Sequence, residues 1–495
     1  MDYVLGIDIG TGSAKAVAVN LVSEPITVAQ LHYPTYSPHP GFSEQDPELI
    51  WEAVKGCVKE IVDKLKSSPL AICFSSAMHS IIPVNEKGSQ LTDMITWADC
   101  RSDAIASRLK NSTQGIHIYE SSGMPLHAMS PLCKIIWLKE NMPDVFNQTY
   151  KFISIKEYIW FKLFDEYVID HSIACASGML DISSRTWSQE LLGLAGISEN
   201  QLSKPVSTTY IATGAHSLQG ILNKETIFVI GASDGCLANL GSFAIRKGVA
   251  AVTIGTSGAV RIASDKPIFN KEAMTFSYCL DENTFICGGP VNNGGNVLQW
   301  LITSFLAKTV NKQNIEEVFA LAETVSPGAD GLLFLPYING ERAPVWDAKS
   351  SGAFVGIRSV HTQANFSRAV LEGICYALND VLIAVETGSE NISQVNVSGG
   401  FVNSQTWMQL LADITGKRLA LLQTEDASAK GAAFMAIKAL GLNDGKYPAD
   451  IQNDRSIFIE PDPEKHKLYK RNFQVFKRLY SGLKDSMHQL NLINS

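Results

Sequence analysis

The sequence lacks the features that mark membrane, secreted and zinc proteins. No apolar run approaches the roughly 18 residues that a membrane-spanning helix needs, and Asp2 and Asp8 stand where a secretory signal peptide would be apolar. The nine cysteines include no C-x-x-C pair and no zinc-type spacing. We therefore expect reduced core cysteines in a cytoplasmic protein that neither spans nor binds a membrane.

Excess positive charge is also missing. The 495 residues include 41 Lys and Arg against 49 Asp and Glu, a formal net charge of −8. Nucleic-acid phosphates would repel such a chain, so we expect no nucleic-acid partner. The one dense basic stretch, residues 465–484, has apolar residues at helical spacing. This pattern predicts an amphipathic helix over about 464–488 with a solvated basic face.

Two common nucleotide-binding motifs are absent. No G-x-x-x-x-G-K-[ST] string occurs, which excludes a Walker A loop. Gly10 and Gly12 begin like a Rossmann fingerprint, but Lys15 stands where the third glycine is needed. The next residues, AKAVAVN, alternate as a strand does, whereas the fingerprint requires a helix. A nucleotide site in this chain must therefore have a different architecture.

Strand-like apolar segments alternate with helical patterns along the whole chain, which predicts an α/β fold. A chain of 495 residues is too long for one core, so we expect two domains. The segment LGIDIGTGSAKAVAV, which begins at Leu5, is echoed by VAAVTIGTSGAVRIA, which begins at Val249. The echo indicates a duplication, and we predict domains at 1–245 and 246–495.

Each echoed segment has the pattern of a β-hairpin with a turn rich in glycine and hydroxyl groups. Successive backbone N–H groups in such a turn form an anion-binding nest. The first turn adds the side chains of Thr11, Ser13 and Lys15, and the second adds Thr256 and Ser257. Two nests that face each other across a cleft would suit a polyphosphate.

Two aspartates stand in or directly after apolar strands. Asp8 lies inside the first strand, where a carboxylate is costly unless it is paired or holds a cation; beside phosphates that cation would be Mg²⁺. The alternative is that Asp8 is a hydrogen-bonded turn residue. Asp234 follows the strand TIFVIGA, at the kind of strand end that carries catalytic groups. In phosphoryl transfer, an aspartate can orient and deprotonate the acceptor hydroxyl.

With these residues in view, the chain resembles the FGGY family of carbohydrate kinases over nearly its full length. The most specific segment is GAFVGIRSVHTQANFSRAVLEG, residues 352–373, which is similar to the family's signature of spaced glycines before a helix. The family's other segments stand in order around it: GIDIGTGSAK, SSAMHS, TWADCRS, IGASDG, TIGTSGAV, GERAPVW and VSGGF. The segments SSAMHS, TWADCRS, IKEYI and GGPVNNGG are similar to those of members that act on gluconate.

The resemblance implies two actin-like (ribonuclease H-like) ATPase domains with a central catalytic cleft, sugar mainly on the first domain and ATP mainly on the second. It implies that Asp234 is the general base and that Asp8 organises metal and phosphate. The implied nucleotide-side residues are Thr11, Gly12, Ser13, Lys15, Gly255, Thr256, Gly295, Gln299, Gly400 and Ser404. The implied sugar-side residues are Met78, His79, Trp97, Arg101, Lys156, Asp234 and Gly235.

The implied reaction transfers a phosphoryl group from MgATP to a sugar or sugar acid, with gluconate to 6-phosphogluconate as the expected case. Gluconate carries a carboxylate, which favours a cation in the sugar pocket. The candidates for that cation are Lys156, Arg101, His79 and His127. For Lys156 and Arg101 the alternative is an ordinary structural salt bridge.

Two alternatives stay open. Family members often have a polar or charged pair at the positions of Met78 and His79 and an amide at the position of Gly235, so a pentulose or polyol kinase such as xylulokinase is one alternative. A non-catalytic actin-like module that binds ATP is the other, although the presence of both Asp8 and Asp234 speaks against it. The resemblance also implies a homodimer.

Overall fold

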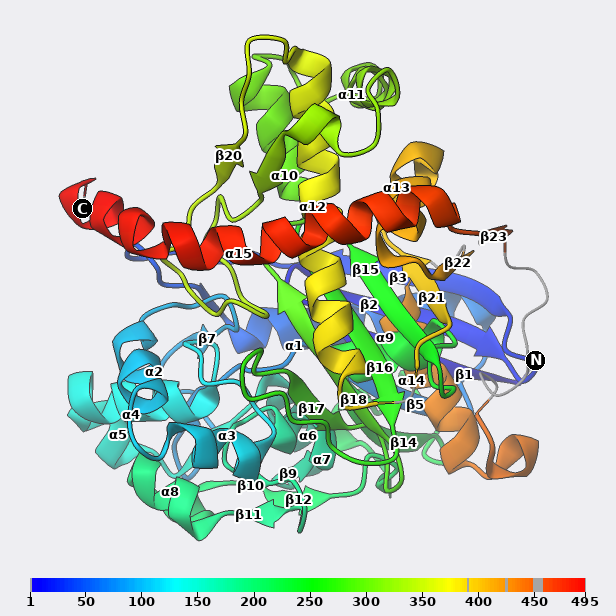
Figure 1. Ribbon diagram of the computed structural model, residues 1–495. Coiled ribbons are helices and arrows are strands. Elements are labelled where there is room, and N and C mark those ends of the chain that lie inside the picture. Colours follow the sequence, from blue (N-terminus) through cyan, green and yellow to red (C-terminus); the bar gives the residue numbers. More distant parts are fainter. Residues whose placement is uncertain (1, 390, 423–425, 448–456, 495) are drawn as a thin grey trace.

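The fold is built on two large β-sheets, one from each half of the chain, with helices around them (Figure 1). The computed structural model describes residues 2–389, 391–422, 426–447 and 457–494. The α/β class and the two-part organisation that the sequence predicts are both confirmed.

The elements of the first half are, in chain order, β1 (Tyr3–Ile9), β2 (Ser13–Asn20), β3 (Pro25–His32), β4 (Glu44–Gln45), α1 (Pro47–Leu65), β5 (Ala71–Ser76), β6 (Ile82–Val84), β7 (Met94–Ile95), α2 (Asp103–Lys110), α3 (Gly115–Ser122), α4 (Pro131–Asn141), α5 (Pro143–Gln148), β8 (Lys151–Ile153), α6 (Ile155–Phe164), β9 (Val168–Asp170), α7 (His171–Cys175), β10 (Leu180–Asp181), β11 (Thr186–Trp187), α8 (Gln189–Ala195), β12 (Lys204–Val206), β13 (Ile211–Thr213), β14 (Ile227–Ser233) and α9 (Asp234–Gly241).

Those of the second half are β15 (Val249–Ile254), β16 (Gly258–Ser264), β17 (Phe276–Cys279), β18 (Phe285–Val291), α10 (Gly295–Trp300), α11 (Lys312–Glu323), β19 (Leu333–Leu335), β20 (Ala353–Val355), α12 (Gln363–Glu386), β21 (Gln394–Ser398), α13 (Gln405–Thr415), β22 (Arg418–Leu421), α14 (Ala427–Ala439), β23 (Ile457–Ile459) and α15 (Pro463–Asn494).

The two sheets repeat one topology. The first has the strand order β13-β14-β5-β1-β2-β3, and the second has β23-β22-β21-β15-β16-β18 with β17 added at its edge. In each sheet the first two strands form an antiparallel hairpin, and the next two pair parallel beside it. The echo in the sequence is therefore a repeat of fold, and its two hairpins are β1–β2 and β15–β16.

The remaining elements surround these sheets. Between β5 and β14 the chain adds a layer of short helices and small sheets, α2 to α8, which lies at the lower left of Figure 1. In the second half, α12 runs from the sheet into a lobe that contains α10 and α11 (Figure 1). The amphipathic helix predicted over about 464–488 is part of α15, whose apolar stripe buries Tyr469, Phe473 and Phe476.

The predicted boundary at 245/246 falls between α9 and β15, but the two halves interlock in space. Helix α14, from the second half, packs against α9, β1 and β5 of the first. Glycines make this close packing possible: a Cβ atom on Gly6 would overlap the carbonyl oxygen of Ala429, and one on Gly431 would overlap that of Leu237. Gly431 is therefore a close-packing residue of α14.

Eight of the nine cysteines are buried and all nine are free thiols, with Cys100 as the exposed exception. Among the described residues, no helix combines the length and apolar character needed to cross a membrane.

We predict that Gly431→Ala destabilises the protein, because its methyl group would meet backbone that cannot move aside as a side chain could. Overpacking of this kind costs about 1–3 kcal/mol, and the midpoint of thermal unfolding measures it. The control is Gly482→Ala on α15, where no atom lies within 4 Å of the added Cβ. That change should be neutral or stabilising, since alanine favours a helix over glycine by about 1 kcal/mol. Equal midpoints for the two variants would contradict the packing argument.

Candidate active site

Asp8 and Asp234 lie at one edge of the first sheet. Strands β1, β5 and β14 run parallel, so their carboxyl ends meet at the same edge. Asp8 is paired in register with Ser75 of β5, and Asp234 directly follows β14. Ser75, between them, donates a hydrogen bond of 2.7 Å from Oγ to Asp8 Oδ1. The sheet therefore brings together two aspartates that are far apart in the sequence.

The carboxylate of Asp8 is held in a state that disfavours its charge. Loss of water raises its pKa to about 6, and the nearby negative charge of Asp234 adds to this rise. The hydrogen bond from Ser75 and the positive charge of Lys15 oppose it. An enclosed carboxylate that lacks a full counter-charge is a fitting ligand for a hard cation such as Mg²⁺.

Asp234 starts helix α9, and its neighbours fix it there. Ser233 caps the helix by accepting from Cys236 N, and its hydroxyl accepts a 2.9 Å hydrogen bond from Ser172. The Gly235 N–H donates to Asp234 Oδ1 at 2.7 Å. Burial raises the pKa of Asp234, while the positive charge of Arg261 lowers it most among the opposing groups. A carboxylate with a raised pKa is better matched to base catalysis near neutral pH.

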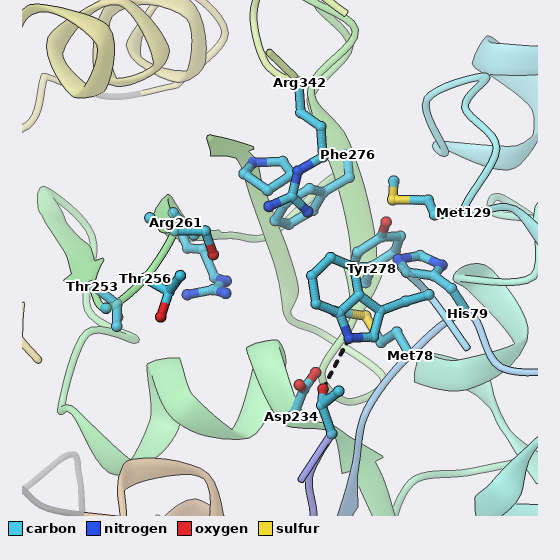
Figure 2. Close-up of a pocket in the computed structure, with 17 residues that line it drawn as sticks. Met78, His79, Met129, Asp234, Thr253, Thr256, Arg261, Phe276, Tyr278 and Arg342 are labelled. Carbon is cyan, nitrogen blue, oxygen red and sulfur yellow. Dashed lines mark hydrogen bonds between the residues drawn. The ribbon is translucent and has the colours of Figure 1, made fainter. Parts of the chain in front are cut away.

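A cavity of about 320 Å³ opens beside Asp234, between the two halves of the chain (Figure 2). Seven residues from the predicted set line it: Thr11, Met78, His79, Trp97, Asp234, Gly255 and Thr256. Trp97 Nε1 donates to Thr11 Oγ1 at 2.9 Å, which ties the sugar-side segment to the first glycine turn. Because residues of both halves form the walls, this cavity is the floor of an interdomain cleft.

A second cavity, of about 1120 Å³, lies in the second half of the chain. Five of the predicted nucleotide-side residues line it: Gly255, Gly295, Gln299, Gly400 and Ser404. Its apolar wall includes Leu298, Phe401 and Trp407, which suits a flat base. Since Gly255 lines both cavities, the second glycine turn is the point at which they meet.

The first glycine turn is braced from outside. Gln45 Nε2 donates to the carbonyl oxygen of Thr11 at 2.5 Å, and Tyr33 N donates to that of Gly12 at 3.3 Å. Ser13 accepts from Gln30, and Lys15 forms an ion pair with Asp426 at the start of α14. Gly12, Ser13 and Lys15 thus stand beside Thr11 without lining either cavity, and their phosphate contacts stay predictions.

For Arg101 and Lys156 the structure favours the alternative of structural salt bridges, because each forms a buried ion pair and neither lines the two cavities. Arg101 binds Asp99 at 2.8 Å and Glu44 at 2.6 Å, and its guanidinium lies 3.8 Å from the centre of the Phe42 ring. Their interactions give both side chains a structural role.

Lys156 donates to Asp170 and to the carbonyl oxygen of Ala232, both at 2.8 Å. It thereby fixes the end of β14 just before Asp234, and it lines neither cavity.

The two histidines proposed as cations are neutral. Burial lowers the pKa of both His79 and His127 to about 3. His79 Nδ1 lies 2.8 Å from the carbonyl oxygen of Ala176, so this nitrogen carries the proton and donates. His79 lines the cavity as a neutral ring, and it does not supply a positive charge for a substrate carboxylate.

The lining residues that had no predicted role include Met129, Arg261, Phe276, Tyr278 and Arg342. Arg261 stands in the apolar strand β16, so it carried the same signal that singled out Asp8, a charge inside an apolar strand. Tyr278 and Arg342 gave no such signal, since tyrosine is ordinary in a strand and Arg342 lies in a loop.

Paired sheets of one topology, with a glycine turn from each at a shared cleft, define a phosphotransferase of the actin-like fold. The models of the FGGY carbohydrate kinases match twice, the N-terminal domain at residues 3–241 and the C-terminal domain at 250–440. The chain belongs to the FGGY family of carbohydrate kinases. Family membership makes it an enzyme with ATP as phosphoryl donor.

Relatives with two different substrate names cover almost the whole chain. A gluconokinase of Bacillus licheniformis is 39% identical over 99% of this chain and 97% of its own. A xylulose kinase of Staphylococcus epidermidis is 29% identical over 98% and 97%. Two solved structures from Lactobacillus acidophilus, a gluconate kinase and a ligand-bound xylulose kinase, each align with a TM-score of 0.94 and 33% identity. Both alignments cover 99% of this chain, with 99% and 100% of the respective structures.

We predict that Asp8→Asn makes the ligand-free protein more stable at pH 8, because it removes a desolvated charge while an oxygen remains for Ser75. The pKa of Asp8 is about 6 in the fold, against an ordinary value of 3.8 for an aspartate, so the contribution of this group to wild-type stability falls as pH rises between those values. The gain should therefore be full above pH 6, at up to about 3 kcal/mol, and should vanish near pH 4.

Thermal unfolding at both pH values measures this gain. The control, Asp63→Asn on the exposed face of α1, should show none, since Lys59 lowers the pKa of that carboxyl. An Asp8→Asn variant that is less stable than wild type at pH 8 would contradict the account.

Proposed function

We propose that the protein phosphorylates D-gluconate at its terminal hydroxyl, with MgATP as donor, to give 6-phosphogluconate and ADP. The observation that carries this proposal is the 39% identity to a gluconokinase over almost the full length, against 29% for a xylulose kinase. The predicted cytoplasmic location and homodimer stay predictions, which fractionation and light scattering test.

In the proposed reaction Asp234 accepts the proton of the acceptor hydroxyl as the oxygen attacks the γ-phosphorus. A new P–O bond forms to the sugar, the bond to the β-phosphate oxygen breaks, and ADP leaves with that electron pair. The raised pKa of Asp234 and the fixed position of its carboxylate at the start of α9 support this role.

The glycine turns around Thr11 and Thr256 would hold the triphosphate through backbone N–H groups. Asp8 is the residue that would hold the metal, directly or through water. Bound Mg²⁺ neutralises charge on the phosphate oxygens. The enclosed setting of Asp8 and its raised pKa fit that use.

Asp234→Asn should lower kcat for gluconate by at least about 10²- to 10⁴-fold, because the amide cannot accept the proton. The Kd for ATP should change by less than about threefold, since Asp234 lies outside the larger, nucleotide-side cavity. A coupled ADP-release assay and calorimetry measure the two quantities. Asp63→Asn serves as the control, and near-normal turnover of Asp234→Asn would remove Asp234 from the base role.

A parallel assay of gluconate, xylulose, ribulose and glycerol tests the substrate. We expect kcat/KM for gluconate to exceed each of the others by at least about 10-fold, which corresponds to 1.4 kcal/mol of transition-state binding. A higher value for xylulose would favour the xylulokinase alternative. ATP binding without any sugar-dependent ADP release would favour the non-catalytic module.

A further inference from the structure

Two arginines, Arg261 and Arg342, point into the cavity beside Asp234 from different elements of the second half (Figure 2). Arg261 projects from β16, and Arg342 follows the loop at Gly340. With Arg101, Lys156, His79 and His127 excluded as free cations, these two are the positive charges that face the cavity. They are therefore the candidates for binding an anionic group of the sugar substrate.

Arg261 forms no direct contact with a counter-charge of any described residue, although the negative charge of Asp234 acts on it more than any other opposite charge does. Within the described part of the chain it makes neither an ion pair nor a hydrogen bond, and its Nε atom is buried. The hydroxyl of Tyr278, another lining residue, is also buried and unpaired. Leaving a buried donor unsatisfied costs about 1–3 kcal/mol, and more for a charged group. Donors in that state at a cavity wall indicate a ligand that completes them.

Gly235 gives Arg261 the space it occupies. A Cβ atom on residue 235 would lie 3.2 Å from Arg261 Nε and 3.2 Å from Met78 Cε. Any larger side chain at this position would compete with the guanidinium for the cavity. The small size of Gly235, in the first half of the chain, therefore leaves room for the side chain of Arg261 from the second half.

Arg342 is held rigidly but is not neutralised by an ion pair. Its Nε donates to Asn292 Oδ1 at 2.7 Å, and its guanidinium carbon lies 5.4 Å from the centre of the Trp97 ring. The adjacent Glu341 carboxyl instead accepts from Asn293 Nδ2 at 3.0 Å and from backbone N–H groups. Burial and the positive charge of Arg261 both lower the pKa of Arg342, to about 10. An anion bound between the two guanidinium groups would offset the electrostatic repulsion between them.

We propose that Arg261, with Arg342, binds the carboxylate of the sugar acid, and that Gly235 sets this specificity by leaving room for Arg261. The proposal rests on the proposed function, since it concerns the acid group of the same substrate. It places the anion contact on the second half of the chain, while Met78 and Asp234 of the first half face the rest of the sugar. The bound sugar acid would thus contact residues from both halves of the chain.

The same guanidinium groups could meet a different anion, the γ-phosphoryl group of ATP. The two cases differ in what a substitution does to neutral substrates. A carboxylate site matters only for acids, whereas a phosphoryl site matters for every acceptor and for ATP. Kinetics with gluconate and with the neutral ketose xylulose, each at varied ATP, distinguish them.

Arg261→Met should lower kcat/KM for gluconate about 10- to 100-fold, chiefly through KM, because charge-assisted hydrogen bonds are lost. The ratio of gluconate to xylulose kcat/KM should fall by a similar factor, and KM for ATP should stay within about threefold. Arg261→Lys should recover part of the ratio. Gly235→Asn should lower the ratio as well, by displacing Arg261. Arg471→Met, on the exposed face of α15, is the matched control and should change nothing.

Equal losses for gluconate and xylulose with a raised KM for ATP would overturn the proposal in favour of a phosphoryl contact. An unchanged gluconate KM would overturn it outright. If Arg261→Met fails to fold, the gluconate-to-xylulose ratios of Arg261→Lys and Gly235→Asn decide instead. A wild-type enzyme that prefers xylulose contradicts the proposed function whatever the variants do. A wild type that prefers gluconate, with variants that keep its preference, contradicts only the arginine assignment.

Discussion

The structure depends on two carboxylates, Asp8 and Asp234, that one sheet edge brings close together and partly removes from water. Burial raises the pKa of both carboxyls, so their charged forms are less stable than that of a surface aspartate. The negative charge of Asp234 raises the pKa of Asp8 further. Carboxyl groups with raised pKa values that lie close together are typical of functional sites, where a ligand or a reaction step requires them. We propose that Asp8 serves a cation and the phosphates, and that Asp234 accepts a hydroxyl proton.

The surrounding architecture serves this pair. Parallel strands β1, β5 and β14 set the spacing, and Ser75 and Lys156 fix the strand ends. Helix α14 of the second half packs against β1 through glycine contacts, and Asp426 at its start pairs with Lys15. The two halves are therefore connected by close backbone packing behind the cleft, while the cavities lie open in front of it.

Most of the fold could be predicted from sequence because its signals are local. Strand alternation, the echoed hairpins and the amphipathic pattern of the last helix need no tertiary information. Asp8 and Asp234 could be found for the same reason, since a charge in or after an apolar strand is visible along the chain. Whether Arg101 and Lys156 are free cations or salt-bridge partners could not be decided from the sequence, because a sequence does not show which carboxylate pairs with a given lysine or arginine. Glu44 and Asp170, their partners, lie 57 and 14 residues away. Arg261 differs from them in forming no ion pair with any described residue, which is a property of the folded cavity.

The central claim is that the two glycine turns hold a triphosphate whose far end meets a sugar hydroxyl beside Asp234. A crystal structure with gluconate and a non-hydrolysable ATP analogue tests it most directly. The account predicts phosphates between the turns at Thr11 and Thr256, with a terminal gluconate oxygen within about 3.2 Å of the Asp234 carboxylate. Phosphates bound away from both turns, or an Asp234 that touches no sugar oxygen, would contradict it.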